Sequence, residues 1–201
     1  WMKALANDAI SPYGYSRNMN RFLRCSDYDL YHTNGMWMHC NHITCVVARK
    51  KQKPYVITPH GMLYPQAMDR SAWKKQLLLK FGGVDKDLRL AACIHCTCME
   101  EMKHYRELGY KNPVAVIPNP VPIPLFVNAL KCDRSVRRIG FLGRLHPRKN
   151  VEALIEAWIA LGNNVKDAQL VIMGKGELPY EQMLKKRVAS HGLKNMEFAG
   201  F

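Results

Sequence analysis

The chain has 201 residues, of which 48% are hydrophobic and 23% are charged, and its 30 Lys and Arg against 16 Asp and Glu give a formal charge of +14. This apolar content can build a buried core and excludes disordered, collagen-like and low-complexity chains. No apolar run approaches the roughly 20 residues of a membrane span. The first residues lack a secretory signal pattern, so we expect one or two compact domains whose seven cysteines stay thiols.

Seven short apolar runs alternate with helical patterns along the chain. They cover residues 28–32, 55–58, 92–96, 114–117, 138–142, 169–173 and 196–199. Most are continuously apolar rather than alternating, which is typical of strands covered on both faces. The repeated order of strand, helix and strand predicts an α/β protein with parallel sheets.

Three helices are predicted from capping residues and apolar spacing. The first starts at a capping box formed by Thr97 and Glu100, the second starts at the N-cap Asn150, and the third covers residues 179–190. A glycine follows the end of each of the first two. The apolar residues expected to face inward are Met102, Tyr105, Leu108, Val151, Leu154, Ile155, Trp158, Leu161, Met183, Leu184 and Val188.

One conspicuous boundary lies between residues 118 and 137. Pro120, Pro122 and Pro124 stand at alternate positions, which excludes a helix or a central strand and indicates a stiff connector. We therefore predict a first domain over residues 1–126 and a second over residues 127–201.

The first candidate site residue is His60, which follows the predicted strand 55–58 and precedes Gly61. In open parallel sheets, ligands bind beyond the carboxyl ends of the strands, and glycine lets a ligand or a backbone approach closely. His60 is therefore either a site residue or an ordinary loop histidine, and the position alone leaves both interpretations open.

A second candidate site lies where the strand 138–142 leads into Gly143, a basic loop and a helix start. Arg144 and Lys149 would place two fixed cations beside the amide-rich N-terminus of a helix, an arrangement that suits a diphosphate. The alternative is an ordinary solvated basic loop.

Two further patterns are weaker. Residues 173–177 again run from a strand through glycines toward a helix, but they lack the spacing of dinucleotide and P-loop motifs and alone predict a tight turn. Cys93, His95, Cys96 and Cys98 resemble a metal cluster. Because their positions on the predicted strand would point them to opposite faces, we expect no metal site there.

The excess positive charge attracts phosphate groups, whether in nucleic acids, anionic lipids or nucleotides. The basic residues are dispersed, which favours ordinary solvated faces. The second interpretation is a basic face resting on an anionic membrane surface. The sequence shows no helix-turn-helix, zinc-finger or RNA-binding pattern, and we therefore expect no nucleic acid partner.

Six segments occur in an order and spacing that resembles the retaining glycosyltransferases of family 4. They are residues 29–37, 57–63, 94–101, 116–119, 141–149 and 173–177, and together they cover almost the whole chain. The resemblance implies the GT-B fold, with two Rossmann-like domains of parallel sheets, each only partly present here. It further implies transfer of a sugar with retention from a UDP- or GDP-linked donor, without a metal or other cofactor. The acceptor would be a glycan or lipid-linked molecule of cell-envelope polysaccharide synthesis.

The resemblance also implies roles for individual residues. His60 matches the histidine that projects toward the transferred sugar, which implies a catalytic role. Arg144 and Lys149, with Gly143, match the residues that grip the donor diphosphate. The residues that match the stretch lining the nucleotide are Gly174, Lys175 and Glu177.

Some features depart from the family pattern. Pro120 and Asn150 stand where glycine is usual, and Asn34 stands where a second histidine is common. The family's glycine-rich loop and its Glu-x7-Glu element match no part of the sequence, so we expect an interior piece of a longer enzyme. The alternative is a catalytically inactive remnant that binds a ligand or a partner. We expect a cytoplasmic location, with a peripheral position on the inner face of the membrane as its variant.

Overall fold

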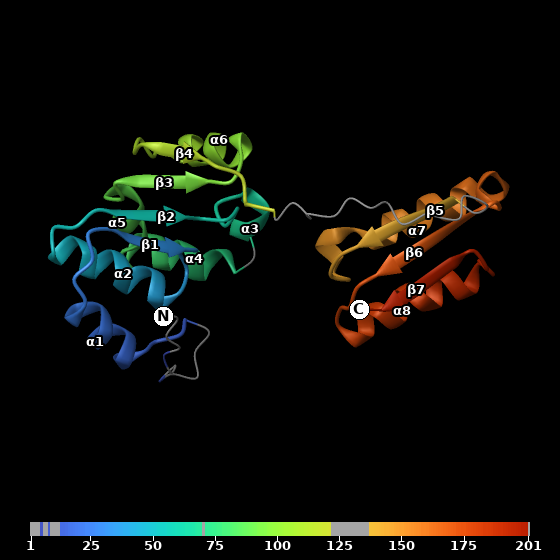
Figure 1. Ribbon diagram of the computed structural model, residues 1–201, viewed down its shortest axis with the longest axis horizontal. Coiled ribbons are helices and arrows are strands. Elements are labelled where there is room, and N and C mark those ends of the chain that lie inside the picture. Colours follow the sequence, from blue (N-terminus) through green and yellow to red (C-terminus); the bar gives the residue numbers. More distant parts are fainter. Residues whose placement is uncertain (1–4, 6–7, 9–12, 70, 122–136, 201) are drawn as a thin grey trace. The chain divides into compact units, whose positions relative to one another are not determined.

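The computed structural model describes residues 5, 8, 13–69, 71–121 and 137–200 (Figure 1). The chain divides into two compact units, Trp1–Ile123 (unit 1) and Pro124–Phe201 (unit 2). The predicted domain boundary at residues 126 and 127, and most of the proline connector, lie outside the described residues. Within the described ranges, no helix is long and apolar enough to span a bilayer.

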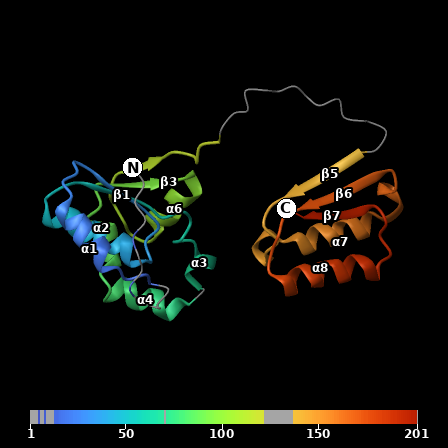
Figure 2. The same cartoon turned by 60° about the horizontal axis from the view of Figure 1, so that its bottom comes forward.

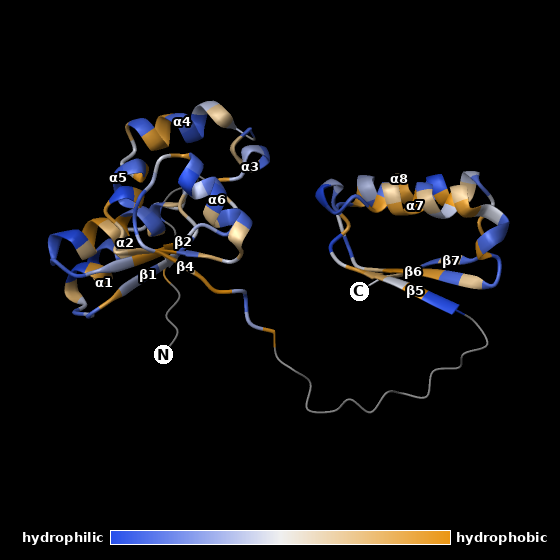
Figure 3. Ribbon diagram, turned by 90° about the horizontal axis from the view of Figure 1, so that it is seen from above, coloured by the Kyte–Doolittle hydropathy of each residue, from blue (hydrophilic) through white to orange (hydrophobic). Residues whose placement is uncertain are grey.

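Unit 1 contains a parallel sheet of four strands in the order β1-β2-β3-β4. The helices that connect successive strands lie on one face of this sheet (Figure 3), as right-handed crossovers require. Its elements are α1 (Arg17–Cys25), β1 (Tyr31–Asn34), α2 (His39–Lys50), β2 (Tyr55–Thr58), α3 (Pro65–Asp69), α4 (Ala72–Lys80), α5 (Val84–Arg89), β3 (Cys93–Cys96), α6 (Met99–Glu107) and β4 (Val114–Val116).

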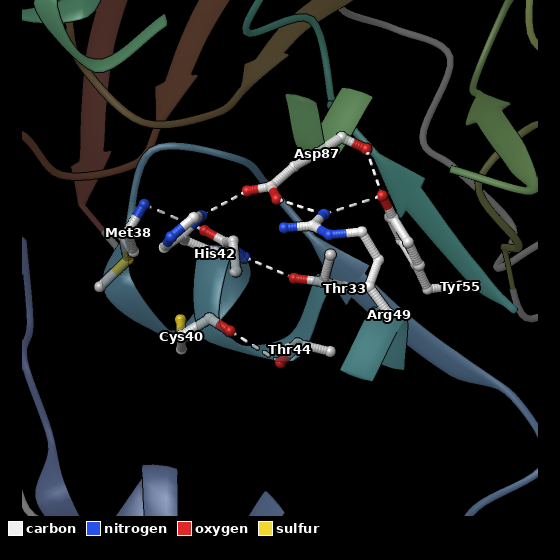
Figure 4. A network of polar contacts seen from close by, with 9 residues as sticks. Thr33, Met38, Cys40, His42, Thr44, Arg49, Tyr55 and Asp87 are labelled. Carbon is white, nitrogen blue, oxygen red and sulfur yellow. Dashed lines mark hydrogen bonds and ion pairs between the residues drawn. The ribbon is translucent and has the colours of Figure 1, made fainter. Parts of the chain in front are cut away.

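A buried carboxylate ties α2, β2 and α5 together in the core of unit 1 (Figure 4). Asp87 Oδ2 lies 2.6 Å from His42 Nδ1, and Asp87 Oδ1 accepts a hydrogen bond of 2.6 Å from Arg49. The hydroxyl of Tyr55 donates to the Asp87 carbonyl at 2.8 Å and accepts from Arg49 at 3.0 Å. Burial acts to lower the pKa of Arg49, but its hydrogen bonds to Asp87 and Tyr55 outweigh it and the pKa is raised.

Unit 2 contains a parallel sheet of three strands in the order β5-β6-β7. Helices α7 and α8 cover one face of it (Figure 3), and Ile155, Trp158, Leu170, Ile172 and Leu184 are buried between these layers. The elements are β5 (Arg137–Leu142), η1 (Pro147–Lys149), α7 (Val151–Leu161), η2 (Gly162–Val165), β6 (Ala168–Met173), α8 (Leu178–Ser190) and β7 (Met196–Gly200).

All seven predicted strands are present, and β1 shows the largest shift because it begins at Tyr31 rather than Tyr28. The prediction that the strands are covered on both faces is wrong for the described residues. Burial alternates along β1 and β6, because helices cover only one face of each sheet. The helices α1 to α5 were not predicted, although α1 carries Met19, Phe22 and Leu23 on one face that packs against the core of unit 1.

The helix predictions need correction at two helix starts and at three residues predicted to face inward. The capping box of Thr97 and Glu100 is wrong: α6 begins at Met99, and the carboxylate that returns to Thr97 belongs to Glu101. Asn150 does precede α7, but its side chain makes no cap and its backbone is left-handed at φ +51°. Asparagine tolerates this conformation, which explains how it stands where the family usually has glycine. Three residues predicted to face inward are exposed instead, namely Leu108, Leu161 and Met183.

Candidate active site

His60 lies directly beyond the carboxyl end of β2, as predicted. Its backbone has φ +52°, and the following Gly61 has φ +70°. His60 Nε2 is 3.0 Å from Oδ1 of Asn34, which ends the neighbouring strand β1. A positive φ is uncommon for a residue other than glycine, and such conformations gather at functional sites. The loop therefore presents an exposed imidazole whose ring is oriented by the side chain of Asn34.

The buried carboxylate of Glu101 fixes the His60 loop from the other side. Glu101 Oε1 accepts a hydrogen bond of 2.5 Å from the Gly61 amide. Its Oε2 accepts from both the amide and the hydroxyl of Thr97, at 2.7 and 2.9 Å. One side chain of α6 thus joins the end of β3 to the loop after β2. This makes Glu101 a positioning residue for His60. The segment 94–101 identified in the sequence includes Glu101, but no role was predicted for it.

Replacing Glu101 with alanine is expected to destabilise unit 1 by about 2–3 kcal/mol, because it leaves two partly buried backbone amides, those of Gly61 and Thr97, without an acceptor. Hydrogen exchange at residues 59–64 should accelerate more than exchange in β4, since the His60 loop loses its tether. The matched control is Glu100→Ala, which removes an exposed carboxylate from the same helix. Equal effects of the two variants would contradict the positioning role.

A chain of hydrogen-bonded polar side chains lies next to His60, on the face of the sheet that the connecting helices do not cover (Figure 3). His32 Nε2 lies 2.7 Å from the hydroxyl of Thr58, which is 3.0 Å from His95 Nδ1. The other ring nitrogen of His95 lies 2.8 Å from the Ile117 carbonyl. Burial, followed by the neighbouring His95 and His60, lowers the pKa of His32. Its imidazole therefore stays neutral to a lower pH than that of a free histidine.

In unit 2, the loops that follow β5 and β6 run side by side in parallel, with a bridge between Leu145 and Gly176. The Gly143 amide donates to the Met173 carbonyl at 3.0 Å, and the Leu145 amide donates to the Lys175 carbonyl at 2.8 Å. A Cβ at Gly174 would overlap the Gly143 carbonyl oxygen, and one at Gly176 would overlap that of Leu145. Both glycines are therefore required for the loops to approach each other, whatever else they contact.

Arg144 and Lys149 both lie at this end of the sheet, on the loop between β5 and α7. Both side chains are exposed, and in the part of unit 2 that the structure describes neither forms an ion pair. Lys149 ends the short helix η1, whose N-cap His146 accepts from the Arg148 amide at 3.2 Å. No side chain caps the start of α7. Lys149 thus stands close to a helix start that no side chain caps, and Arg144 lies on the loop that leads to it. Such a combination of cations and helix amides is a suitable environment for an anion.

The third predicted segment supplies one more cation and an unexpected carboxylate. Lys175 and Glu177 are exposed on the turn between β6 and α8. Glu181, in the first turn of α8, accepts a hydrogen bond of 2.6 Å from the Gly176 amide. That amide is therefore already occupied. As with Glu101 in unit 1, a glutamate of the following helix holds the loop after a strand in place.

The structure thus brings Gly143, Arg144, Gly174 and Lys175 into adjacent loops of unit 2, whereas His60 belongs to unit 1. The roles of Asn34, Glu101 and Glu181 were not predicted. Each depends on a contact between segments 5 to 40 residues apart, and spacing along the sequence gives no direct sign of such contacts.

Comparison with known families matches both parts of the chain. Residues 5–120 match the model of the glycosyl transferase 4-like domain, and residues 128–201 match that of glycosyl transferases group 1. A phosphatidyl-myo-inositol mannosyltransferase of Mycobacterium tuberculosis is 22% identical over 179 residues, which are 87% of this chain and 44% of the relative. Granule-bound starch synthase 2 of Solanum tuberosum is 42% identical over 69 residues, which are 33% of this chain and 8% of the relative.

Solved structures show the same fold. HepE of Anabaena, solved with UDP and glucose, gives a TM-score of 0.74 at 17% identity over 99% of this chain and 55% of its own. Sucrose-phosphate synthase of Thermosynechococcus elongatus gives 0.67 at 19% identity over 98% of this chain and 53% of its own. The chain therefore spans about half the length of these proteins. The predicted fold class, α/β with Rossmann-like units of parallel sheet as in GT-B proteins, is confirmed.

Proposed function

The chain belongs to the family of glycosyl transferase 4-like and group 1 domains, and from this premise we propose that it forms part of a nucleotide-sugar-dependent glycosyltransferase. The enzyme transfers a sugar with retention to a glycan or lipid-linked acceptor in cell-envelope polysaccharide synthesis. The mycobacterial relative, whose name describes a phosphatidyl-inositol mannosyltransferase, supports a lipid-linked acceptor.

The observation that carries the proposal concerns two cations, Arg144 and Lys149, at the carboxyl end of the sheet in unit 2. Neither forms an ion pair with a described residue. Departure of a nucleoside diphosphate builds negative charge on the leaving phosphate. Fixed cations and helix amides offset this charge most effectively when they are already in place, because no reorganisation is then needed. Two such cations can do so without a metal ion, and we propose a metal-independent reaction. Gly174 and Gly176 let the loop with Gly143 and Arg144 lie against the turn with Lys175 and Glu177, which would line the nucleotide.

On the acceptor side, we assign the sugar contact to His60. Asn34 Oδ1 is a hydrogen-bond acceptor, so the imidazole nitrogen 3.0 Å from it carries the proton. The other nitrogen, Nδ1, is then a free acceptor for a sugar hydroxyl. A ring that is oriented before the substrate binds loses little conformational freedom on binding, which favours a defined position of the transferred sugar.

Titration calorimetry with UDP and GDP tests the donor site directly. We expect binding of at least one nucleotide, with UDP first because the HepE structures contain UDP. Arg144→Ala and Lys149→Ala should each weaken it by about 1.5–3 kcal/mol, or roughly 10- to 150-fold, the range for hydrogen bonds to charged groups.

The matched control is Arg148→Ala, because Arg148 is an exposed cation of the same loop to which the family resemblance assigns no role. We expect this variant to bind within about twofold of the original chain. Equal losses from Arg148→Ala and Arg144→Ala would indicate a diffuse electrostatic attraction. The absence of binding by a folded chain would contradict a donor site within these residues.

A further inference from the structure

Helix α4 carries apolar residues on two opposite faces. Leu78 and Leu79 point inward and pack against the core of unit 1. Trp73 and Leu77 of α4, with its C-cap Phe81, are spaced four residues apart, point outward and expose 69%, 52% and 73% of their surface. We call these three residues the Trp73 stripe. α4 lies at the rim of unit 1, beyond the helices that cover the sheet (Figure 2). Leu78 and Leu79 make the contacts of α4 with the core, so the stripe has no role in the packing of the described residues.

Positive charge flanks the stripe on both sides. The ammonium nitrogen of Lys74 lies 5.4 Å from the centre of the Trp73 ring, and that of Lys80 lies 5.6 Å from the Phe81 ring. Lys75 instead lies on the inward side, near the ring of Trp37. Residues 71–84 contain no Asp or Glu. The exposed face of α4 is thus apolar along its centre and exclusively cationic at its edges.

This combination is the physical signature of a helix that lies in the plane of a membrane interface. Apolar and aromatic side chains enter the boundary between headgroups and acyl chains, and lysines at the edge meet lipid phosphates. Tryptophan in particular favours the interfacial layer. An aqueous surface, by contrast, gives three large apolar residues of one short helix no compensation for their hydration. The absence of acidic residues selects an anionic surface over a neutral one.

We propose that α4 docks this protein on anionic membrane surfaces, with the Trp73 stripe inserted and Lys74 and Lys80 facing lipid phosphates. The inference does not depend on the proposed glycosyltransferase activity, because it concerns a different face and requires no nucleotide. It assigns Lys74 and Lys80 to one membrane-facing surface, although the basic residues are dispersed along the sequence.

Vesicle co-sedimentation of the full chain tests the proposal. The test compares vesicles of pure phosphatidylcholine with vesicles that contain about 30% of the anionic lipid phosphatidylglycerol. We expect at least tenfold stronger partitioning onto the anionic vesicles, and this difference should shrink as salt screens the charges. The triple variant Trp73→Ser, Leu77→Ser, Phe81→Ser should lose at least tenfold of this binding. Its matched control replaces three other exposed leucines of unit 1, Leu30, Leu90 and Leu108, with serine and should bind as the original chain does.

The charge contribution is separated by a second pair of variants. Lys74→Glu with Lys80→Glu should weaken binding to anionic vesicles about tenfold or more. Lys86→Glu with Lys103→Glu, which makes the same change in net charge on α5 and α6, should cost less than about threefold. All these side chains are exposed, so circular dichroism should confirm an unchanged fold. Trp73→Phe should keep the binding but lose most of the vesicle-induced blue shift of tryptophan fluorescence.

Three results would overturn the inference. One is equal or absent binding to anionic and neutral vesicles. Another is anionic binding that the serine variant of the Trp73 stripe leaves intact, which would place the contact elsewhere on the chain. The third is self-association without vesicles that the same variant abolishes, because the stripe would then cover a second copy of the chain. Nucleotide titration of the serine variant keeps this test separate from that of the donor site.

Discussion

Replacing Gly174 with alanine is expected to destabilise unit 2 by about 3–5 kcal/mol, because the added Cβ meets backbone that cannot move aside. The obstacle is the Gly143 carbonyl, and Gly174 itself has φ +149°, which other residues rarely adopt. The Gly143 amide is hydrogen-bonded to the Met173 carbonyl at 3.0 Å, so relief of the overlap would break the parallel pairing of the two loops. Hydrogen exchange in β6, with urea unfolding, measures the loss.

Gly192→Ala is the matched control in the same unit. Gly192 also has a positive φ, +63°, but an added Cβ there would meet nothing within 4 Å. It should cost only about 1 kcal/mol, the backbone component alone. Equal losses would show that the close pairing of the two loops does not require glycine at position 174. A loss of nucleotide binding in Gly174→Ala would therefore reflect the disturbed loop structure rather than a lost contact with the nucleotide. Lys175 and Glu177 are exposed, so their replacement tests the nucleotide contact directly.

Replacing Asp87 with alanine is expected to destabilise unit 1 by about 3–5 kcal/mol, because it leaves the partly buried Arg49 guanidinium without the carboxylate that balances its charge. Arg49 would lose its 2.6 Å hydrogen bond, and His42 Nδ1 would lose its own contact of 2.6 Å (Figure 4). Asp87→Asn keeps one acceptor oxygen and should fall between the alanine variant and the original chain. Thermal and urea unfolding, followed by circular dichroism, provide the measurement.

The control for Asp87 lies two residues away on the same helix. Asp85 pairs with Arg89 at 2.7 Å, but its side chain is 39% exposed. Its replacement with alanine should cost less than that of Asp87, about 1–2 kcal/mol, because solvent screens the exposed pair and only the Tyr110 hydroxyl, which donates to Asp85 at 2.9 Å, loses an acceptor. If both alanine variants lost the same stability, burial of the Asp87 network would not be what makes it important.

The strands and the loops that follow them could be predicted because the necessary information is local. A run such as residues 55–58 is apolar and bounded by turn residues, and a strand end followed by glycine or by a basic loop marks the edge of a parallel sheet where ligands bind. His60 and Arg144 therefore follow strand ends, and Lys149 lies just before a helix start, as predicted. Their chemical roles come from the family resemblance and stay predictions.

Contacts between distant segments escaped prediction. Glu100 and Glu101 are adjacent carboxylates that look equivalent along the chain. The choice between them is made by the start of α6 at Met99, which turns Glu101 toward Gly61 and leaves Glu100 exposed. Likewise, nothing in the sequence near Asp87 announces that His42 and Arg49 will surround it, because α2 and α5 meet only when the sheet assembles.

By itself, the sequence determined the α/β class, the seven strands and the loops that carry the candidate site residues, since hydrophobic runs and turn residues act over a few positions. Only the tertiary structure decided which apolar residues of a helix face the core. Leu78 and Leu77 are the same amino acid at neighbouring positions, yet one packs inside and the other belongs to the exposed Trp73 stripe. The rotation of a helix against its neighbours makes that choice, and it depends on packing between elements far apart in the chain.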